Sequence, residues 1–283
     1  MSNRFSRRGL AAAAMLPAAA ILPAAFARKA EAAGAESTFD RIRRTKVMRV
    51  AGLNGELPWF SKDIATGKWS GAAADMATDI ASVFDAKIVY VEATYGSSIL
   101  DLQSNKVDIG FALNPTPQRA LSVTFTEPTI IHPFGCIAKK GFAPKTWADL
   151  DKPDIRIAVD SGSLHEVVAK RFAPRARIIA FPNRDAAILA LQSGHADVDI
   201  LAALLGLTAI AKNPSLGPYH LLTPIVALPS SIAIQREPDT RFRDVLNAWI
   251  EFNRGIGTIR EWLINGLVLE GVKRSQIPPE LTF

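Results

Sequence analysis

Segments with strand character and segments with helix character alternate along most of this chain, and this alternation constrains its fold more than any other feature. A strand pattern at 47–53 precedes an amphipathic run at 72–84, and a β-branched strand pattern follows at 87–91. Shorter helix and strand patterns occupy 97–102 and 107–113. Because parallel strands need a crossover between them, the alternation predicts a mostly parallel sheet with helices on both faces.

The alternation begins again in the second half of the chain. Strand patterns occur at 134–138, 155–159, 177–181, 197–201 and 226–235. Helix patterns occur at 164–172, 185–192, 240–254 and 256–267. The loop after the first strand contains Gly55 and Pro58 and leads into a polar, hairpin-like stretch that ends at Gly71. The sequence therefore predicts an α/β protein with two units.

The first 32 residues have the three parts of a secretory signal. Basic residues at 4–8 precede an Ala-rich run at 9–26 and small residues up to 32. The pair Arg7-Arg8 resembles a twin-arginine (Tat) signature. A membrane anchor is the alternative, although Pro17 and Pro23 interrupt the weakly apolar run. We expect the segment to be removed on export, so that the mature protein works in the periplasm.

Most of the positive charge belongs to that N-terminal segment. Five basic side chains against one acidic one give residues 1–32 a charge of +4 out of a total of +6, which leaves +2 for the rest. The mature chain therefore gives no support to nucleic-acid binding. Cys136 is the only cysteine, which excludes an internal disulfide, and the four histidines lack metal-ligand spacing. We expect no metal and no cofactor.

Three motifs in order resemble the family 3 extracellular solute-binding proteins, the binding components of polar amino acid ABC importers. They are Leu-Gln-Ser-Asn-Lys-Val-Asp-Ile-Gly at 102–110, Asn-Pro-Thr-Pro-Gln-Arg-Ala at 114–120 and Val-Thr-Phe-Thr-Glu-Pro at 123–128. Gly162-Ser163 and the segment 194–197 match further family motifs. The resemblance covers about 39–267.

The resemblance implies a two-lobed periplasmic binding protein fold of type II. Lobe 1 is expected to comprise 46–137 and 235–283, and lobe 2 to comprise 138–234, each with a mostly parallel sheet flanked by helices. Two crossing strands would join the lobes, which would close on a small ligand by a hinge motion. The implied ligand is an amino acid or another small carboxylate, the implied partner is the membrane permease of an ABC importer, and we expect a monomer.

Arg119 is the first candidate for contact with the ligand. In the family the arginine of this motif binds the ligand's carboxylate, and a guanidinium fork can do so with two hydrogen bonds. Thr116 is a good N-cap and Pro117 a good first helical residue, so free N–H groups would point at the same anion. The alternative is a surface ion pair of Arg119 with Glu127 or Asp108.

Lobe 2 is expected to supply a second helix start at Ser161-Gly162-Ser163. Ser163 and Glu166 have the spacing of a capping box, and the hydroxyls of Ser161 and Ser163 could meet the ligand. The alternative is an ordinary cap without ligand contact. Asn114 stands where the family often places a hydroxyl residue that contacts the ligand, and Thr116 could offer its own hydroxyl instead of capping.

Three aromatic residues, Trp59, Phe60 and Tyr95, could either stack on the ligand or belong to the core. In the family an acid in lobe 2 holds the ligand's ammonium group, but its position falls here on Ala202. Asp199 lies nearby, at a depth that strand alternation does not favour. Glu56 is the one acid of the first loop and could replace the missing acid, or it could be a solvated loop residue.

Two other classes of protein compete with a transport component. The cyclohexadienyl dehydratases are enzymes on the same fold, which directs attention to Ser163, His165 and Glu166 as a possible catalytic group. Residues two apart on a helix point to different faces, so Ser163 and His165 should not form a dyad. A sensor module is the second rival, but such modules are normally followed by a membrane segment or a kinase.

Overall fold

The computed structural model describes residues 36–277, and its central feature is one eight-stranded sheet. The strands lie in the order β4-β1-β5-β10-β6-β9-β7-β8. Their bounds, in that order, are Lys87–Glu92, Val47–Gly52, Ile109–Leu113, Tyr219–Gln235, Val123–Ala138, Val198–Ala202, Arg156–Asp160 and Arg177–Phe181. A separate ladder pairs β2 (Ser61–Lys62) with β3 (Trp69–Ser70), which confirms the predicted hairpin before Gly71.

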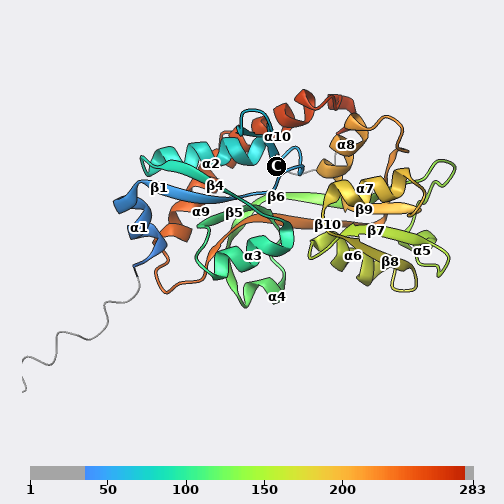
Figure 1. Cartoon of the computed structure of the whole chain (residues 1–283), viewed down its shortest axis with the longest axis horizontal. Coiled ribbons are helices and arrows are strands. Elements are labelled where there is room, and N and C mark those ends of the chain that lie inside the picture. Colours follow the sequence, from blue (N-terminus) through green and yellow to red (C-terminus); the bar gives the residue numbers. More distant parts are fainter. Residues whose placement is uncertain (1–35, 278–283) are drawn as a thin grey trace, which may run out of the picture. The chain divides into compact units, whose positions relative to one another are not determined.

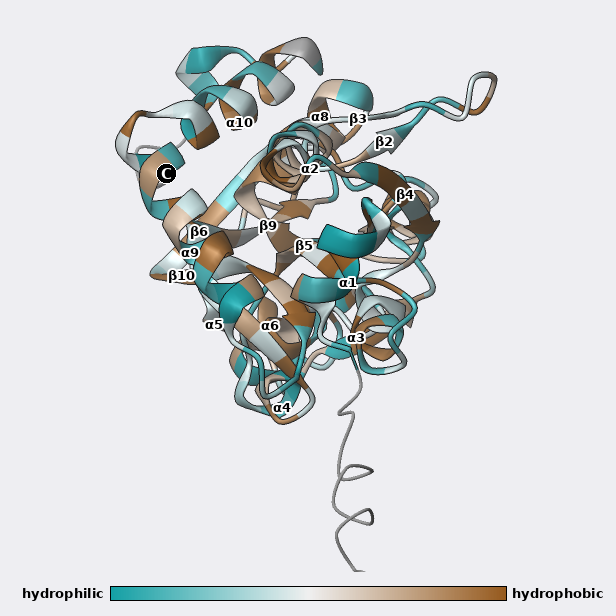
Figure 2. Cartoon of the chain, turned by 90° about the vertical axis from the view of Figure 1, so that its left-hand side faces the viewer, coloured by the Kyte–Doolittle hydropathy of each residue, from teal (hydrophilic) through white to brown (hydrophobic). Residues whose placement is uncertain are grey.

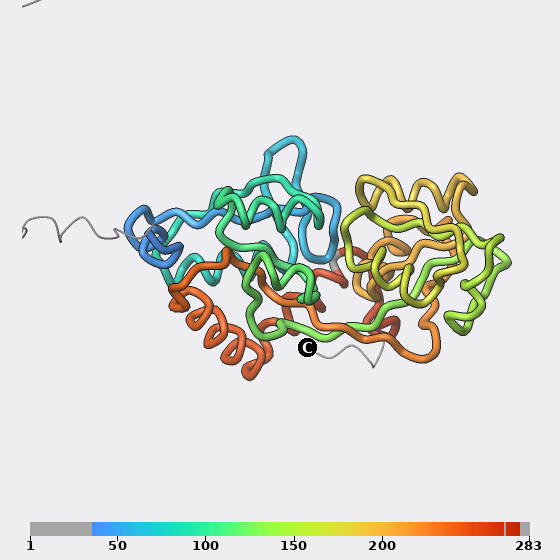
Figure 3. The backbone as a smooth tube through the Cα atoms, turned by 90° about the horizontal axis from the view of Figure 1, so that it is seen from below, coloured from blue at the N-terminus to red at the C-terminus, as the bar shows by residue number. Residues whose placement is uncertain are grey.

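Two long antiparallel strands, β6 and β10, divide the sheet into two halves. We call β4, β1 and β5 the first half, and β9, β7 and β8 the second half. Pairing is parallel between β1 and both of its neighbours, and between β7 and both of its neighbours. The strands β6 and β10 pair from Val123 to Ile137, and Figure 3 shows their traces running together from one half to the other. The predicted α/β fold is thus confirmed.

Helices cover both faces of this sheet. The helices are α1 (Thr38–Thr45), α2 (Ala72–Val83), α3 (Tyr95–Gln103), α4 (Pro117–Ala120), α5 (Trp147–Leu150), α6 (Leu164–Phe172), α7 (Arg184–Gln192), α8 (Ala203–Lys212), α9 (Arg241–Gly255) and α10 (Thr258–Leu269), followed by a short 3-10 turn at Arg274–Gln276. In Figures 1 and 2, α2, α8 and α10 lie on one side of the sheet, and α3, α4 and α6 lie on the other.

The core follows from this layering. All residues of β5 and β9 are buried, and Figure 2 shows these strands as apolar segments between helices with hydrophilic outer surfaces. One apolar cluster includes Leu53 and Trp59 of the first half together with Leu204 and Leu205 on α8 of the second half. The hydroxyl of Thr208 on α8 also donates to the carbonyl of Leu57 at 2.8 Å. The two halves therefore pack on each other through α8.

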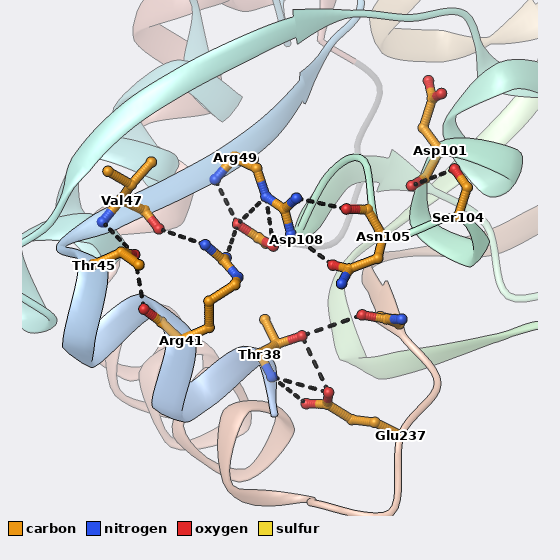
Figure 4. Close-up of polar contacts among 11 residues, drawn as sticks. Thr38, Arg41, Thr45, Val47, Arg49, Asp101, Ser104, Asn105, Asp108 and Glu237 are labelled. Carbon is orange, nitrogen blue, oxygen red and sulfur yellow. Dashed lines mark hydrogen bonds and ion pairs between the residues drawn. The ribbon is translucent and has the colours of Figure 1, made fainter. Parts of the chain in front are cut away.

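A buried aspartate fixes the geometry of each half. Asp108, which is fully buried, accepts from the backbone N–H of Arg49 at 2.7 Å and contacts the guanidinium groups of Arg49 and Arg41 (Figure 4). In the second half, Asp197 accepts from the backbone N–H of Arg156 at 2.8 Å and from the Arg156 guanidinium. The aspartates of both family motifs thus tie one strand to the next, and Asp108 is engaged with Arg41 and Arg49.

Three sequence expectations concern the boundaries of this structure. The proposed signal segment 1–32 lies outside the described residues. The predicted lobe limits at 137/138 and 234/235 fall at the ends of β6 and β10, and the division into lobes stays a prediction. Within 36–277, no helix combines the length and the apolar character that crossing a membrane requires.

Candidate ligand site at the carboxyl ends of the strands

The carboxyl ends of four parallel strands meet at one place between the two halves of the sheet. The loops after β1, β4, β7 and β8 together line a cavity of about 30 Å³. Such edges are where open α/β sheets bind ligands, because strand ends and helix starts supply polar groups there. The lining includes Glu56, Tyr95, Asp160, Ser161 and Asn183.

A buried ionic cluster extends from Asp160, which lines this cavity on the side of the second half. The guanidinium of Arg184, at the start of α7, contacts the carboxylate of Asp160 and lies 3.2 Å from Oδ1 of Asp199. The Nδ1 atom of His165 lies 2.9 Å from Oδ1 of Asp160 and 2.7 Å from Nη2 of Arg184. All four side chains are at most 4% exposed. One guanidinium therefore serves two carboxylates in a nearly dry environment.

The pKa values in this cluster follow from burial and from the shared guanidinium. Burial opposes ionisation of Asp160, but Arg184 and His165 together hold its pKa below the ordinary value. Burial raises the pKa of Asp199 to about 7, with Arg184 acting in the opposite direction. Burial also lowers the pKa of His165, which keeps this imidazole neutral at pH 7. The cluster thus carries Asp160 as a carboxylate and Arg184 as its counter-ion.

Glu56 adds a third acid from the first half of the sheet. It is 6% exposed, so the alternative of a solvated loop residue is wrong. Burial raises its pKa to about 8, while Arg184 and the hydroxyl of Tyr95 act in the opposite direction. Among the described residues, Oε2 of Glu56 and Oδ2 of Asp160 have no hydrogen-bond partner. Two buried carboxyl groups at the cavity thus each keep a free oxygen.

Arg119 lies on the other side of the same region, at the start of α4. Its guanidinium donates to the carbonyl of Asn114 at 3.2 Å and, across to the second half, to the carbonyl of Gly162 at 2.8 Å. Burial lowers the pKa of Arg119, and Asp160 and Tyr95 are the nearby groups that act against this shift. Its hydrogen-bond partners are carbonyl groups, so the alternative of a surface pair with Glu127 or Asp108 is not formed.

Asn114 and Thr116 hold the loop that carries Arg119. The hydroxyl of Thr116 accepts from the backbone N–H of Arg119 at 3.2 Å, so Thr116 is the predicted N-cap. The amide of Asn114 donates to the carbonyl of Pro229 on β10 at 2.6 Å. Both side chains are half-buried. The loop after β5 is thereby fixed against the crossing strands.

The start of α6 meets the start of α3 across the cavity. A Cβ atom added to Gly162 would lie 3.0 Å from Cα of Gly96, and Gly162 has a positive φ of 72°. Ser161 is exposed, whereas Ser163 is buried and accepts from the N–H of Glu166. The predicted capping box is only half formed, because the Glu166 carboxylate accepts from the N–H of Gly162. This carboxylate thus holds the glycine that faces the first half.

The three aromatic candidates lie in different environments: Tyr95 lines the cavity, whereas Trp59 and Phe60 are in the core. Tyr95 opens α3, lines the cavity and packs edge-on against His165 with ring centroids 6.0 Å apart. Trp59 and Phe60 are at most 1% exposed and belong to the apolar core, where Phe60 contacts the rings of Trp69, Tyr90 and Phe111. Of the three rings, only Tyr95 belongs to the lining of this cavity.

Two charged residues of the site were not identified from the sequence. Asp160 is the last residue of β7, and Arg184 begins α7 shortly after the end of β8. Both residues therefore lie close to the carboxyl end of a strand. The rule that strand ends supply ligand-binding groups could have found them. Ala202 is buried at the end of β9, and Asp199 pairs with Arg184. Within 36–277, no group of three or more His, Cys, Asp or Glu side chains is placed to hold a metal ion.

A sheet of two parallel halves joined by two long crossing strands, with a polar site between the halves, is the fold of the type II periplasmic binding proteins. The chain belongs to the bacterial extracellular solute-binding proteins, family 3, whose sequence model matches residues 49–262. Membership of this family agrees with the three motifs at 102–128.

Three known proteins illustrate the similarity. The cyclohexadienyl dehydratase of Pseudomonas aeruginosa is 25% identical over 231 residues, which cover 80% of this chain and 84% of that protein. The crystal structure of an ancestral amino acid-binding protein, described as a precursor of cyclohexadienyl dehydratase, has a TM-score of 0.72 and 28% identity, covering 84% of this chain and all of that one. The solute receptor for L-cysteine of Neisseria gonorrhoeae shares the fold, with a TM-score of 0.75 and 21% identity over 87% of this chain and 100% of the receptor.

Proposed function

We propose that this protein captures a small α-amino acid outside the cytoplasm and delivers it to the membrane permease of an ABC importer. One observation carries the choice of ligand. The guanidinium of Arg184 pairs with Asp160 and Asp199, whereas Glu56, the other acid beside the cavity, has no guanidinium of its own among the described residues. An ammonium group on the ligand would pair with Glu56 once Glu56 gives up its proton.

The acidic end of the site supports an amine on the ligand. The free oxygens of Glu56 and Asp160 are acceptors for an N–H donor, and both acids line the same cavity. Glu56, with its pKa near 8, would lose its proton when a cation binds beside it. In this proposal Glu56 and Asp160 together replace the acid that the family places at the position of Ala202.

The basic end of the site supports a carboxylate. Arg119 directs its guanidinium at the carbonyl of Gly162, and a ligand carboxylate would offer this group a stronger, charge-assisted pair of hydrogen bonds. The hydroxyl of Ser161, which is exposed and lines the cavity, would add a donor from the second half. Asn114 and Thr116 would hold Arg119 in place through the contacts described above.

Capture would require the two halves to separate and close again. The cavity of about 30 Å³ is small and mostly enclosed, so we expect an amino acid to enter when the halves separate. The long strands β6 and β10 would act as the hinge, and ligand contacts from both halves would favour the closed form. The closed form would be the one recognised by the permease.

A thermal-shift screen of the exported protein tests the proposal. A ligand at 100 times its dissociation constant should stabilise the protein by about 2.7 kcal/mol. The panel pairs each α-amino acid with the carboxylic acid that lacks the amine. We expect stabilisation by amino acids alone. Equal stabilisation by the amine-free acids would refute the role of Glu56 and Asp160, and no response to any amino acid would refute the function.

A dehydratase is the second candidate, because the relative from P. aeruginosa is an enzyme and a buried acid suits general acid–base catalysis. A carboxyl group with a pKa near 8 keeps its proton at pH 7 and could protonate a leaving hydroxyl. The test is incubation with a hydroxycyclohexadienyl carboxylic acid and detection, by mass spectrometry, of the aromatic product formed by loss of water and carbon dioxide. Turnover that disappears in Glu56→Gln would favour the enzyme, whereas binding without turnover would favour transport.

A further inference from the structure

Within 36–277, the crossing strands carry three buried side chains with unpaired polar atoms, His132, Ser230 and Ser231, and the first two lie on one face. His132 on β6 is 4% exposed and Ser230 on β10 is 1% exposed. Among the residues that the structure describes, both ring nitrogens of His132 and the hydroxyl oxygen of Ser230 have no hydrogen-bond partner. Buried polar atoms are nearly always paired in folded proteins, so three unpaired atoms in one place point to a missing partner.

The pairing of the strands places these two side chains on one face. From Phe134 to Ile130, β6 pairs with β10 residue by residue, so that His132 lies opposite Leu228 and Ile130 lies opposite Ser230. Directly opposite residues share a face, and diagonal neighbours in an antiparallel pair have side chains within reach of one another. His132 and Ser230 are diagonal neighbours of this kind.

That face is connected to the ionic cluster beside the proposed ligand site through the ring of Phe134. The ring of Phe134 lies 5.5 Å from the ring of His132 and 5.6 Å from the ring of His165, measured between centroids. His165 belongs to the ionic cluster beside Asp160. On β10, Ser230 follows Pro229, whose carbonyl accepts a hydrogen bond from the side-chain amide of Asn114. His132 is therefore linked through Phe134 to the start of α6, and Ser230 follows the residue that anchors the loop carrying Arg119.

We propose that His132 and Ser230 form the part of the site that selects the ligand's side chain, and that they select an uncharged hydrogen-bonding group such as an amide or a hydroxyl. The inference rests on the proposed function, since it presumes that an amino acid is held by Arg119 at its carboxylate and by Glu56 at its amine.

The chemistry of the two residues supports an uncharged group. Burial and the neighbouring His165 lower the pKa of His132 to about 3, so the imidazole is neutral and offers one donor and one acceptor. A serine hydroxyl likewise donates and accepts. The acids of the ionic cluster already pair with Arg184, and a charged side chain beside His132 would remain unpaired in a buried place.

Calorimetric titration of the exported protein tests this selection. Each polar amino acid is compared with an apolar one of similar size: glutamine and asparagine with leucine, threonine with valine, and serine with alanine. We expect the polar member to bind roughly 10- to 100-fold more tightly, because an apolar side chain leaves the buried polar groups unpaired. Lysine and glutamate measure the preference against charge.

Two variants and two controls separate selection from stability. In His132→Leu and in Ser230→Ala, the preference for the polar member should fall at least fivefold, while binding of the apolar member persists. Ser230→Ala removes a single oxygen atom that has no partner, so it tests the inference even if His132→Leu does not fold. Ser231→Ala and His220→Leu change a buried serine and a partly buried histidine at other places on β10, and should keep the preference.

The outcomes distinguish the two proposals. An unchanged preference in both variants, or tighter binding of lysine or glutamate than of the neutral polar amino acids, would overturn the inference and leave amino acid capture intact. Absence of binding by every amino acid would overturn the proposed function and the inference with it. A preference that falls in Ser230→Ala but survives in Ser231→Ala would support the assignment of this face of β10.

Discussion

Replacing Glu56 with glutamine should stabilise the protein at alkaline pH and leave it unchanged at acid pH. Glu56 is buried beside Asp160 and Tyr95, and burial raises its pKa from an ordinary 4.5 to about 8. Glutamine has the same size and cannot ionise. The variant therefore removes the titration without opening a cavity.

The sign and size of the effect follow from proton linkage. Between pH 4.5 and pH 8 the folded protein keeps a proton on Glu56 that the unfolded chain releases, so the stability of the wild type falls as the pH rises. At ~1.4 kcal/mol per pH unit, this interval corresponds to roughly 5 kcal/mol. The free energies of unfolding of wild type and Glu56→Gln should be nearly equal at pH 4.5 and differ by several kcal/mol above pH 8.

Urea unfolding at pH 5, 6, 7, 8 and 9 measures this difference directly. The effects of other titrating groups, among them Asp199, largely cancel because both proteins carry them. Glu251→Gln, at an exposed position on α9, is the matched control and should follow the wild type at every pH. If the stability of Glu56→Gln stays within about 1 kcal/mol of the wild type from pH 5 to pH 9, the raised pKa of Glu56 is wrong.

Three further predictions test the site and its support. Arg119→Ala should weaken amino acid binding at least 100-fold with little change in the melting temperature. Arg236→Ala is the control, because the Arg236 guanidinium donates to the carbonyls of Ala120 and Leu121, and this variant should bind normally. Equal affinity of the two variants in calorimetric titration would remove Arg119 from the site. Gly162→Ala and Gly194→Ala both place alanine at a positive φ, which should lower the free energy of unfolding by roughly 1–2 kcal/mol. Only Gly162→Ala should also lose affinity for the amino acid. The added Cβ atom at Gly162 would meet Gly96, whereas one at Gly194 meets no atom within 4 Å. Asp108→Asn should lower the free energy of unfolding by about 3–5 kcal/mol, since Arg41 and Arg49 lose a buried carboxylate. The dissociation constant of the folded variant should stay within twofold of the wild-type value. A larger change in affinity would show that Asp108 has more than a structural role.

Local patterns in the sequence were sufficient for several parts of this structure. The helix predicted at 164–172 and the strand predicted at 177–181 have the same bounds in the structure. Thr116 and Ser163 cap the helices at which they were expected, because capping depends on the side chain and on N–H groups two or three residues away. The hairpin before Gly71 was likewise predicted from turn chemistry.

Other elements were missed or too short because distant contacts decide them. Helix α8 was not predicted, since its sequence is apolar nearly all round and lacks the periodicity of an amphipathic helix. Helices α1 and α5 were missed as well. Strand β10 begins seven residues before the predicted 226, where Tyr219 pairs with Ile137 on β6. Pairing with a strand far away in sequence extends a strand beyond what its own residues favour.

By itself, the sequence determined that this chain alternates strands and helices, that its motifs at 102–128 place it in a solute-binding family, and that Arg119 follows an N-cap. These properties depend on neighbouring residues and on motif spacing. Only the tertiary structure decided that Glu56, Asp160 and Arg184 meet, because Glu56 lies in the loop after β1, Asp160 ends β7 and Arg184 begins α7. Burial then changed their chemistry: removal from water raises the pKa of Glu56, and the shared guanidinium holds Asp160 as a carboxylate, neither of which depends on local sequence.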